Sequence, residues 1–372
     1  MNLPVLPSTR GISRTDIEWA DYAVGSPFRF RDKGTGQIYP TACVKVSGGC
    51  KNCYAESIGQ RFGTYLPFTK PNMDRLECVL DQGVIDSVLR FKPRPEKGQA
   101  TYKNGRSRPA VFFGDTTDIF GEWVSFEQLD VLFACFALRP DVDFLLLTKR
   151  PERMAGYLLD EALRLGVGGQ MCADTPERVS AYIAGMGEPY VSRAEGVSWP
   201  LPNVWLGCSV ENQKTADERI PHLLKCPAAV RFVSYEPALG PVDLRRWIGA
   251  RAGTGTPVYV GADGSASPSV EPSPIGWIIV GGESGLDARP FNVEWARSVV
   301  RQCADAGVPC FVKQLGTKPY VVTDATVRDW PGGTQTTRNG QTVSFHLRNR
   351  KGSDPSEWPA DLRVRQVPGG ES

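Results

Sequence analysis

Three cysteines that lie within eleven residues are the feature of this 372-residue sequence best suited to chemistry. Cys43, Cys50 and Cys53 stand in the segment TACVKVSGGCKNCYAE, where six residues separate the first pair and two separate the second. The closely spaced pair can present two thiolates to one metal centre. Gly48 and Gly49 allow the loop to turn sharply around a bulky inorganic group. The sequence therefore predicts a thiolate-ligated metal or cluster site in this loop.

Three ligands suit an iron–sulfur cluster better than a zinc ion. Structural zinc takes four closed ligands, but the sequence has no second CxxC pair, and its two histidines, His222 and His346, are far from the loop in sequence. A distant fourth cysteine could still complete a zinc site, and three ordinary buried thiols are the remaining alternative. A [4Fe–4S] cluster held by three cysteines leaves one iron open for a small chelating ligand. We expect the cluster.

The other cysteines are scattered, several of them inside apolar runs. They are Cys78, Cys135, Cys172, Cys208, Cys226, Cys303 and Cys310. The N-terminus lacks the charged-then-apolar order of a secretion signal, and no run of about 18 apolar residues could span a membrane. A disulfide framework is therefore the weaker interpretation, and we expect a cytoplasmic protein without a membrane span.

Short apolar runs alternate with helix-like stretches from about residue 100 onward. The predicted strands are 110–113, 143–147, 204–207, 230–234, 277–280 and 309–312, with one more before Cys43, and the predicted helices are 125–138, 215–225 and 293–306. In the last helix Asn292 is the expected cap and Gly307 the expected stop. This alternation predicts an α/β fold with a parallel (β/α) barrel, partial or full.

The expected barrel domain covers residues 1–316. Two stretches rich in Gly, Pro, Ser and Ala interrupt it near 182–202 and 249–275, and we interpret them as surface insertions. Residues 317–372 form a polar C-terminal extension with a β-like stretch at 341–347, and we assign it a role in substrate binding.

Polar, charged and glycine residues follow six successive strands of the predicted barrel. They are Gly114, Asp115 and Thr117; Lys149 and Arg150; Cys208, Ser209, Glu211 and Asn212; Glu236; Gly281, Gly282 and Glu283; and Lys313. The carboxyl ends of parallel barrel strands meet at one mouth, where active sites form. The alternative is that strand ends are simply more polar than strand centres.

The loop and the strand ends together resemble known proteins. A three-cysteine loop at the first strand of a (β/α) barrel is similar to the radical S-adenosylmethionine (SAM) superfamily, in which the first gap is usually three residues. More closely, the chain resembles a phage and prophage family of three-Cys-motif proteins of unknown function, which is radical SAM-like and distantly similar to spore photoproduct lyase. The matching segments are DIEWAD (16–21), SGGCKNCYAE (47–56), FFGDTTDIFGEW (112–123), LLLTKRPERM (145–154), WLGCSVENQ (205–213), SYEPALGPV (234–242), VGGESGLDARP (280–290), FVKQLG (311–316) and KGSDPSEWPADLRVRQVP (351–368).

The resemblance implies a [4Fe–4S] cluster on Cys43, Cys50 and Cys53, with SAM chelating the open iron. An external one-electron reductant would then allow SAM to yield a 5′-deoxyadenosyl radical that takes a hydrogen atom from the substrate. The Gly-Asp-Thr-Thr turn at 114–117 stands where the superfamily has a Gly-Gly-Glu-like motif for the SAM ammonium group, which assigns the ammonium to Asp115.

The resemblance also assigns roles to the later strand ends. Lys149, Arg150 and Lys313 suit the SAM carboxylate or a phosphate, and Cys208 is either a hydrogen-atom donor or an inert buried thiol. The other expected cofactor or substrate contacts are Ser209, Glu211, Asn212, Glu236, Gly281, Gly282 and Glu283.

The charge of the chain says little about the substrate. Lys plus Arg is 43 and Asp plus Glu is 41, so no whole-protein field attracts nucleic acid. Local basic sets occur before the loop and in the tail, where two tryptophans are interleaved with arginines. They are Arg29, Arg31 and Lys33, and then Trp330, Arg338, Arg348, Arg350, Lys351, Trp358, Arg363 and Arg365. An equally good interpretation is that these residues form a solvated basic surface with no nucleic-acid partner.

Three functional hypotheses follow from the sequence. The phage context of the similar family favours a nucleobase substrate, such as a hypermodified thymidine-type nucleotide in phage DNA, which would have to be flipped out of a duplex. A radical SAM enzyme acting on a free metabolite or peptide and a non-enzymatic metal-stapled binding protein are the alternatives. The sequence predicts no oligomeric state.

Overall fold

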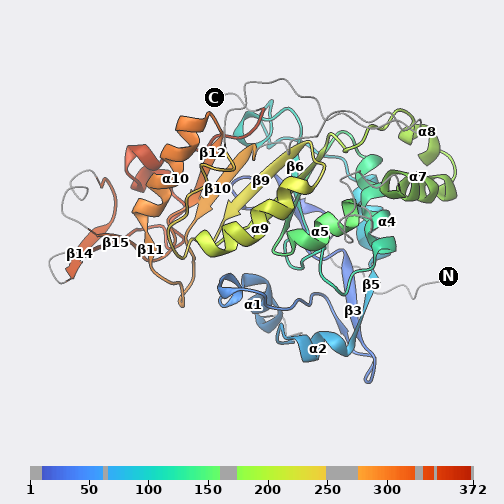
Figure 1. The fold of residues 1–372 in the computed structure, drawn as a ribbon, viewed down its shortest axis with the longest axis horizontal. Coiled ribbons are helices and arrows are strands. Elements are labelled where there is room, and N and C mark those ends of the chain that lie inside the picture. Colours follow the sequence, from blue (N-terminus) through green and yellow to red (C-terminus); the bar gives the residue numbers. More distant parts are fainter. Residues whose placement is uncertain are drawn as a thin grey trace. The chain divides into compact units, whose positions relative to one another are not determined.

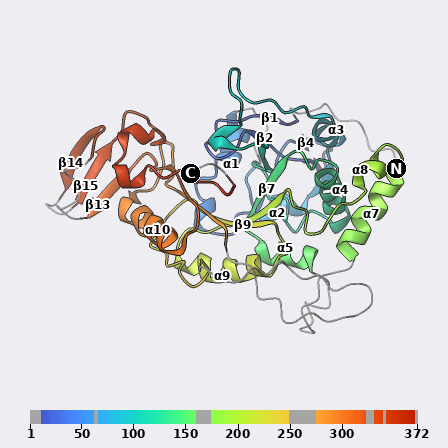
Figure 2. The ribbon, with the colours of Figure 1, turned by 90° about the horizontal axis from the view of Figure 1, so that it is seen from above.

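The computed structural model describes residues 11–61, 66–159, 174–248, 275–322, 330–338 and 342–369 (Figures 1 and 2). The chain divides into two compact units. Unit 1 contains the described residues up to Gly207 together with Lys225–Ala229. Unit 2 contains Cys208–Leu224 and the described residues from Val230 onward. The predicted insertion at 249–275 lies outside the described residues except at its last residue, and Cys172 lies outside them as well.

The main sheet has eight strands in the hydrogen-bonded order β1-β2-β6-β7-β8-β9-β10-β12. Their bounds are β1 Ser13–Arg14, β2 Tyr22–Val24, β6 Ala110–Phe113, β7 Asp143–Thr148, β8 Val204–Ser209, β9 Val230–Tyr235, β10 Trp277–Gly281 and β12 Cys310–Gln314. β1 is antiparallel to β2, whereas the pairs β2–β6, β6–β7, β9–β10 and β10–β12 are parallel. The α/β class and the mostly parallel sheet are therefore confirmed.

The order of these strands is open, because β1 and β12 stand at its two ends and do not pair with each other. Among the described strands this corresponds to a partial barrel and not to a closed one. β2 is the strand expected ahead of the cysteine loop. A closer relation to the radical SAM barrel stays a prediction.

Continuous apolar runs form these strands because helices and loops cover both faces of a parallel sheet. All four residues of β6 are buried, as are all five of β10. In unit 1, the ring of Phe113 meets those of Phe136 and Phe144 edge to face at 5.0 and 6.1 Å, which fills the space between β6, β7 and the helix that joins them.

Unit 1 contains seven described α-helices. They are α1 Tyr54–Arg61, α2 Lys70–Asp74, α3 Gln82–Arg90, α4 Phe126–Ala137, α5 Pro151–Leu158, α7 Asp174–Met186 and α8 Tyr190–Ala194. Of these, α3 and α4 begin at side-chain caps. Ser125 and Gln128 form a reciprocal capping box at the start of α4. Helices α4 and α7 pack against each other (Figure 1). The predicted insertion at 182–202 contains the end of α7 and the whole of α8.

Unit 1 also contains a small antiparallel sheet in the order β4-β3-β5. The strands are β3 Phe28–Asp32, β4 Ile38–Tyr39 and β5 Leu76–Leu80. The basic set before the cysteine loop lies on β3 and in the turn that follows it. Arg29 pairs with buried Asp81, Arg31 pairs with Glu77, and Lys33 Nζ donates to the Asp74 carbonyl at 3.0 Å. These cations therefore have partners within unit 1, which favours a structural role over a nucleic-acid one.

In unit 2, helix α10 (Val293–Ala306) has the bounds that its sequence predicts. The side chain of Asn292 accepts a hydrogen bond from the Glu294 N–H at 3.0 Å, and Gly307 ends the helix with a φ of 66°. Helix α9 (Gln213–Lys225) follows β8. Figure 2 shows α10 beside β13 (Pro319–Val322), one strand of a second sheet.

The second sheet of unit 2 has the order β11-β13-β15-β14. Its other strands are β11 Phe291–Asn292, β14 Thr334–Arg338 and β15 Thr342–His346, so the β-like stretch expected in the tail is present. Beyond it, the chain returns to β12 and extends the main sheet. The Val312 N–H donates to the Val364 carbonyl at 2.8 Å, and the Gln366 N–H donates to the Cys310 carbonyl at 2.9 Å.

The tryptophans of the tail are core residues, so base stacking, one of the two interpretations left open for the tail, does not apply to these two rings. Trp358 is fully buried and Trp330 lies against Phe345 with 8% of its surface exposed. The Arg365 guanidinium lies between the rings of Phe311 and Trp358, at 5.5 Å from each centroid. Because these rings are enclosed, they present no face to an external base.

No described helix combines the length and the apolar character that crossing a membrane requires.

Candidate active site at the three-cysteine loop

The three cysteines of the loop are free thiols of intermediate exposure. Cys50 ends a short 3-10 helix (Gly48–Cys50), and Cys53 directly precedes α1. Burial raises the pKa of the Cys43 thiol to about 12; the nearby Asp118 carboxylate adds to this, the Arg150 guanidinium opposes it, and Cys53 contributes least. Cys43 and Cys53 are therefore near enough to influence each other electrostatically. None of the nine described cysteines is in a disulfide.

The loop is tied to the turn that follows β6. On its N-terminal side, the Thr41 hydroxyl donates to the Thr116 carbonyl, and the Thr117 hydroxyl donates to the Ala42 carbonyl at 2.5 Å. On its C-terminal side, the Tyr54 hydroxyl donates to the Asp115 carbonyl. The structure thus brings the cysteine loop together with the predicted turn at 114–117.

The segment after β7 holds the middle of the loop. The Arg150 guanidinium donates to the Val44 carbonyl at 2.9 Å and pairs with Asp118 and Glu122, each at 3.0 Å. Asp118 is itself fixed by the Thr148 hydroxyl at 2.7 Å. Arg150 is among the residues predicted for the site but its partner Asp118 is not, although this acid lies three residues beyond Asp115 in the same turn.

The neighbouring Lys149 takes part through its backbone. Its N–H donates to the Asp118 carboxylate at 3.1 Å, while its side chain is of intermediate exposure. Lys149 therefore follows directly on β7, and its role as a donor to a ligand stays a prediction.

Asp115 stands out among the acids of unit 1. Its Oδ1 atom is buried and has no hydrogen-bond partner among the described residues. Burial raises the pKa of the Asp115 carboxyl to about 6, although a hydrogen bond from Tyr54 opposes this effect. Gly114, at a φ of 83°, makes the turn that directs this residue; a Cβ there would overlap Ile119. A buried acceptor without a partner is suited to a cationic ligand.

The fit of the loop to a metal centre is partial. Three unpaired thiols on one loop are the donor types that iron–sulfur clusters use. In the part of the chain that the structure describes, however, no three His, Cys, Asp or Glu side chains are gathered so that they could hold a metal ion. The residues fit a cluster by chemistry, and their side chains would have to turn toward one point to hold it.

Three of the residues predicted in unit 2 come together at the ends of β9, β10 and β12. Lys313 Nζ lies 3.2 Å from Glu236 Oε1, and the Ser234 hydroxyl donates to Glu236 Oε2 at 3.3 Å. Gly281 makes room for this pair, because a Cβ there would overlap the Glu236 carboxylate. The pair is largely but not fully buried, with 19% of the Lys313 and 15% of the Glu236 side chain exposed.

The remaining predicted acids of unit 2 have internal partners. Glu211 pairs with Arg219 at 3.1 Å, with both side chains buried, and Glu283 forms a two-pronged pair with Arg289. These interactions give both glutamates a structural role. Whether they also contact a cofactor stays a prediction.

The polar and small residues near these acids are also structural. Asn212 Oδ1 accepts from the Thr215 N–H at 3.1 Å near the start of α9, and the Ser209 carbonyl accepts from Arg219 at 2.8 Å. Gly282 permits close packing, because a Cβ there would lie 2.7 Å from the Leu315 carbonyl oxygen. Cys208 is fully buried in β8.

Comparison with known proteins places the chain in a family. The family model described as "Protein of unknown function (DUF5131)" matches residues 35–344. The chain belongs to DUF5131. No curated protein and no solved structure matches the chain. The range matched by the DUF5131 model contains the cysteine loop and every predicted site residue up to Lys313, and it ends before the segment that returns to β12.

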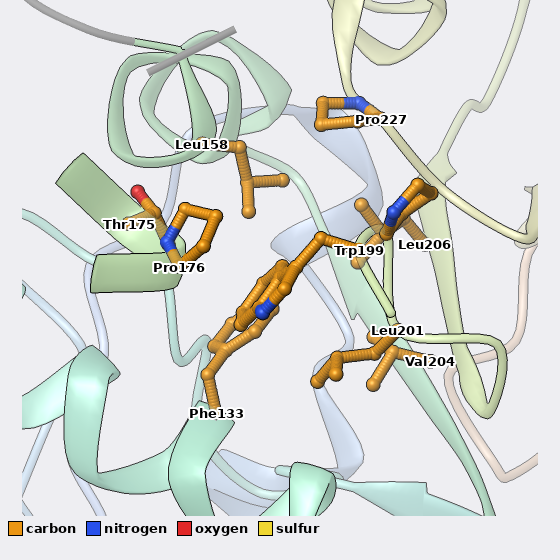
Figure 3. A pocket seen from close by; sticks show the side chains of 10 residues that line it. Phe133, Leu158, Thr175, Pro176, Trp199, Leu201, Val204, Leu206 and Pro227 are labelled. Atoms are coloured by element: carbon orange, nitrogen blue, oxygen red, sulfur yellow. The ribbon is translucent and has the colours of Figure 1, made fainter. Parts of the chain in front are cut away.

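Two cavities of the DUF5131 chain lie away from the predicted site residues. The first, in unit 1, is an apolar space of about 10 Å³ in which Trp199 stacks on Phe133, with Leu158 and Pro176 beside them (Figure 3). No charged side chain lines it, so it offers no group for catalysis. The second, in unit 2, has about 500 Å³. It is lined by the start of α9, by residues 241–243 and 245, and by α10.

Proposed function

We propose that this DUF5131 protein is a radical SAM enzyme in which Cys43, Cys50 and Cys53 hold a [4Fe–4S] cluster. The observation that carries the proposal is the placement of three free thiols on one loop that is hydrogen-bonded to the carboxyl ends of β6 and β7. The resemblance of the loop and of the segments around it to radical SAM-like proteins supports the same assignment.

The cluster and SAM would supply the chemistry, namely reductive cleavage of SAM to methionine and a 5′-deoxyadenosyl radical by an electron from an external reductant. The chain's own residues bind and orient. Asp115, with its unpartnered Oδ1, accepts a hydrogen bond from the ammonium group of SAM. Lys149 is the donor for the SAM carboxylate. Thr117 does not contact the ligand in this proposal, because its hydroxyl holds the loop at Ala42.

In unit 2, Glu236 and Lys313 pair with each other, and their role as cofactor or substrate contacts rests on the sequence alone. Glu211 and Glu283 keep their arginine partners and shape the ends of their strands. Cys208, fully buried, remains either a hydrogen-atom donor or an inert thiol.

We further propose a nucleobase or modified nucleotide in DNA as the substrate. Support for this class comes from the phage context of the similar family. The tryptophans of the tail do not support this class, because a buried ring cannot stack on a base. A free metabolite or peptide is the alternative substrate.

The deciding experiment uses the full chain, purified and reconstituted without oxygen. Iron and acid-labile sulfide should bind together, and reduction in the presence of SAM should release 5′-deoxyadenosine. Cys50→Ala should abolish both results, whereas Cys78→Ala, a free thiol on β5, should leave both unchanged. Cleavage of SAM retained in Cys50→Ala would refute the ligand assignment.

Two further outcomes separate the alternatives. Zinc without sulfide in the wild-type protein would favour a metal-stapled binding protein. Faster release of 5′-deoxyadenosine when DNA is added, together with DNA binding that weakens with salt, would favour a nucleic-acid substrate over a metabolite.

A further inference from the structure

Arg150 is a buried cation that joins three segments of unit 1. Only 6% of its side chain is exposed. Its guanidinium donates to the Val44 carbonyl in the cysteine loop, pairs with Asp118 in the turn after β6, and pairs with Glu122 further along that segment.

The partners of Arg150 are themselves held in place. Asp118 accepts hydrogen bonds from the Thr148 hydroxyl at 2.7 Å and from the Lys149 N–H at 3.1 Å, so its carboxylate is fixed by the same segment that carries Arg150. The Arg150 N–H also donates to the Thr148 hydroxyl at 2.8 Å. The guanidinium lies over the ring of Trp123, 4.8 Å from the centroid. A donor group fixed in this way is set before any ligand arrives.

The interactions that hold the Arg150 side chain in place do not depend on its hydrogen bond to the Val44 carbonyl. Val44 directly follows Cys43, so a hydrogen bond to its carbonyl fixes the backbone beside the first cysteine. Arg153, on helix α5 near Arg150, shows the contrast. Its guanidinium donates to the Gly121 and Val124 carbonyls, in the segment that follows β6.

We propose that Arg150 is a positioning residue for the three-cysteine loop. It holds Cys43 against the ends of β6 and β7, and its charge lies where the thiolates of a bound cluster would bring negative charge. Asp118 offsets part of that charge, whereas Glu122 offsets less because 67% of its side chain is exposed. This inference rests on the proposed function for the cluster, but the positioning itself concerns the loop alone.

The test compares Arg150→Gln and Arg150→Lys with wild type and with the control Arg153→Gln. In the metal-free proteins, amide hydrogen exchange in residues 42–47 should be faster in both Arg150 variants and unchanged in the control. In Arg150→Lys, which keeps the positive charge near Cys43, the rate at which iodoacetamide alkylates Cys43 should rise relative to that of Cys78 in the same sample. Circular dichroism confirms that each variant is folded.

The reconstituted proteins add two measurements. Loss of the cluster to EDTA should be about 10-fold faster in Arg150→Gln, as is typical when a residue that orients a metal ligand is removed. The midpoint potential of the cluster should move to a more negative value in Arg150→Gln, because a buried positive charge favours the reduced form. Arg150→Lys keeps the positive charge but loses the forked geometry of the guanidinium group. The cluster should therefore keep its midpoint potential in this variant, while the amides of the cysteine loop exchange faster than in wild type.

The outcomes are distinguishable. Amide exchange in residues 42–47 equal to wild type in Arg150→Gln, or Cys43 alkylation equal to wild type in Arg150→Lys, would overturn the inference, whether or not a cluster binds. A wild-type protein that takes up no iron and sulfide would overturn the proposed function, while the metal-free measurements would still decide whether Arg150 positions the loop.

Discussion

Replacement of Asp115 by Asn is expected to stabilise the ligand-free protein at neutral pH. The Asp115 carboxyl is largely buried with one unpartnered oxygen, and its pKa in the folded protein is raised from 3.8 to about 6, chiefly by burial. Between these two values the unfolded chain has lost its proton while the folded chain still holds it. The stability of the wild type therefore falls, through this group, as the pH rises from about 4 to about 6, and then levels off.

The size of the effect follows from the same values. Two pKa units at about 1.4 kcal/mol each give an upper limit of about 3 kcal/mol at pH 8, and partial exposure of the side chain reduces it to roughly 2 kcal/mol. Asn carries no charge, so Asp115→Asn should be more stable than wild type by this amount at pH 8 and equal to it near pH 4.

Urea unfolding at both pH values measures the difference. Asp16→Asn, at an exposed position of the same unit, is the control and should change the free energy of unfolding little at either pH. Equal stability of Asp115→Asn and wild type at pH 8 would show that burial does not disfavour the charged carboxyl. In calorimetry, the variant should also bind SAM more weakly if Asp115 meets its ammonium group.

Three further substitutions or deletions test the fold of unit 2. Asn292→Ala removes the cap of α10 and should cost about 1 kcal/mol in urea unfolding, whereas Asn292→Asp should retain stability. Gly282→Ala should cost about 1–3 kcal/mol because its Cβ would meet the Leu315 carbonyl; Gly276→Ala, where the nearest atom lies 3.7 Å away, should be near neutral. A chain ending at Gly352 loses the segment paired with β12 and the buried Trp358, so light scattering should show aggregation through the exposed strand edge; a monodisperse shortened protein would contradict this.

The helices and strands whose positions depend on neighbouring residues in the sequence were predictable. Helix α10 has the expected bounds because Asn292 and Gly307 satisfy the orphan backbone groups at its two ends. The strands β8, β9, β10 and β12 were found by their apolar runs but extend one or two residues further, to Ser209, Tyr235, Gly281 and Gln314. Ladder hydrogen bonds join backbone groups, so polar side chains at a strand end do not stop the pairing.

The contacts of the tail and of the N-terminal region were harder to predict. Trp358 and Arg365 lie in a polar segment, yet the Trp358 ring is fully buried because this segment returns to cover the edge of β12. Arg29 appeared as part of a basic set, but its partner, Asp81, lies about fifty residues away in sequence. Neither composition nor spacing reveals which distant segments meet.

Because contacts between distant segments cannot be read from the sequence, only part of the candidate site could be predicted. The sequence correctly grouped the cysteine loop with the turn after β6, because both follow strands whose ends meet in a parallel sheet. It did not anticipate that Arg150 bridges the two, since Val44 and Arg150 are 106 residues apart. The pairing of Glu283 with Arg289 spans only six residues, but nothing in a loop sequence fixes that geometry.

The partners of the buried acids show which carboxylate the fold leaves without a cation. A buried carboxylate is costly unless a cation or several donors satisfy it. Glu211 and Glu283 each have an arginine, and Asp118 has Arg150 as well as two donors. Asp115 keeps an unpartnered buried oxygen among the described residues, next to the loop that carries the thiols. Because these other acids are satisfied from within, we propose that Asp115 takes a cation from outside. The ammonium group of an amino-acid-like ligand would supply both the charge and the hydrogen-bond donor that the Asp115 Oδ1 atom lacks.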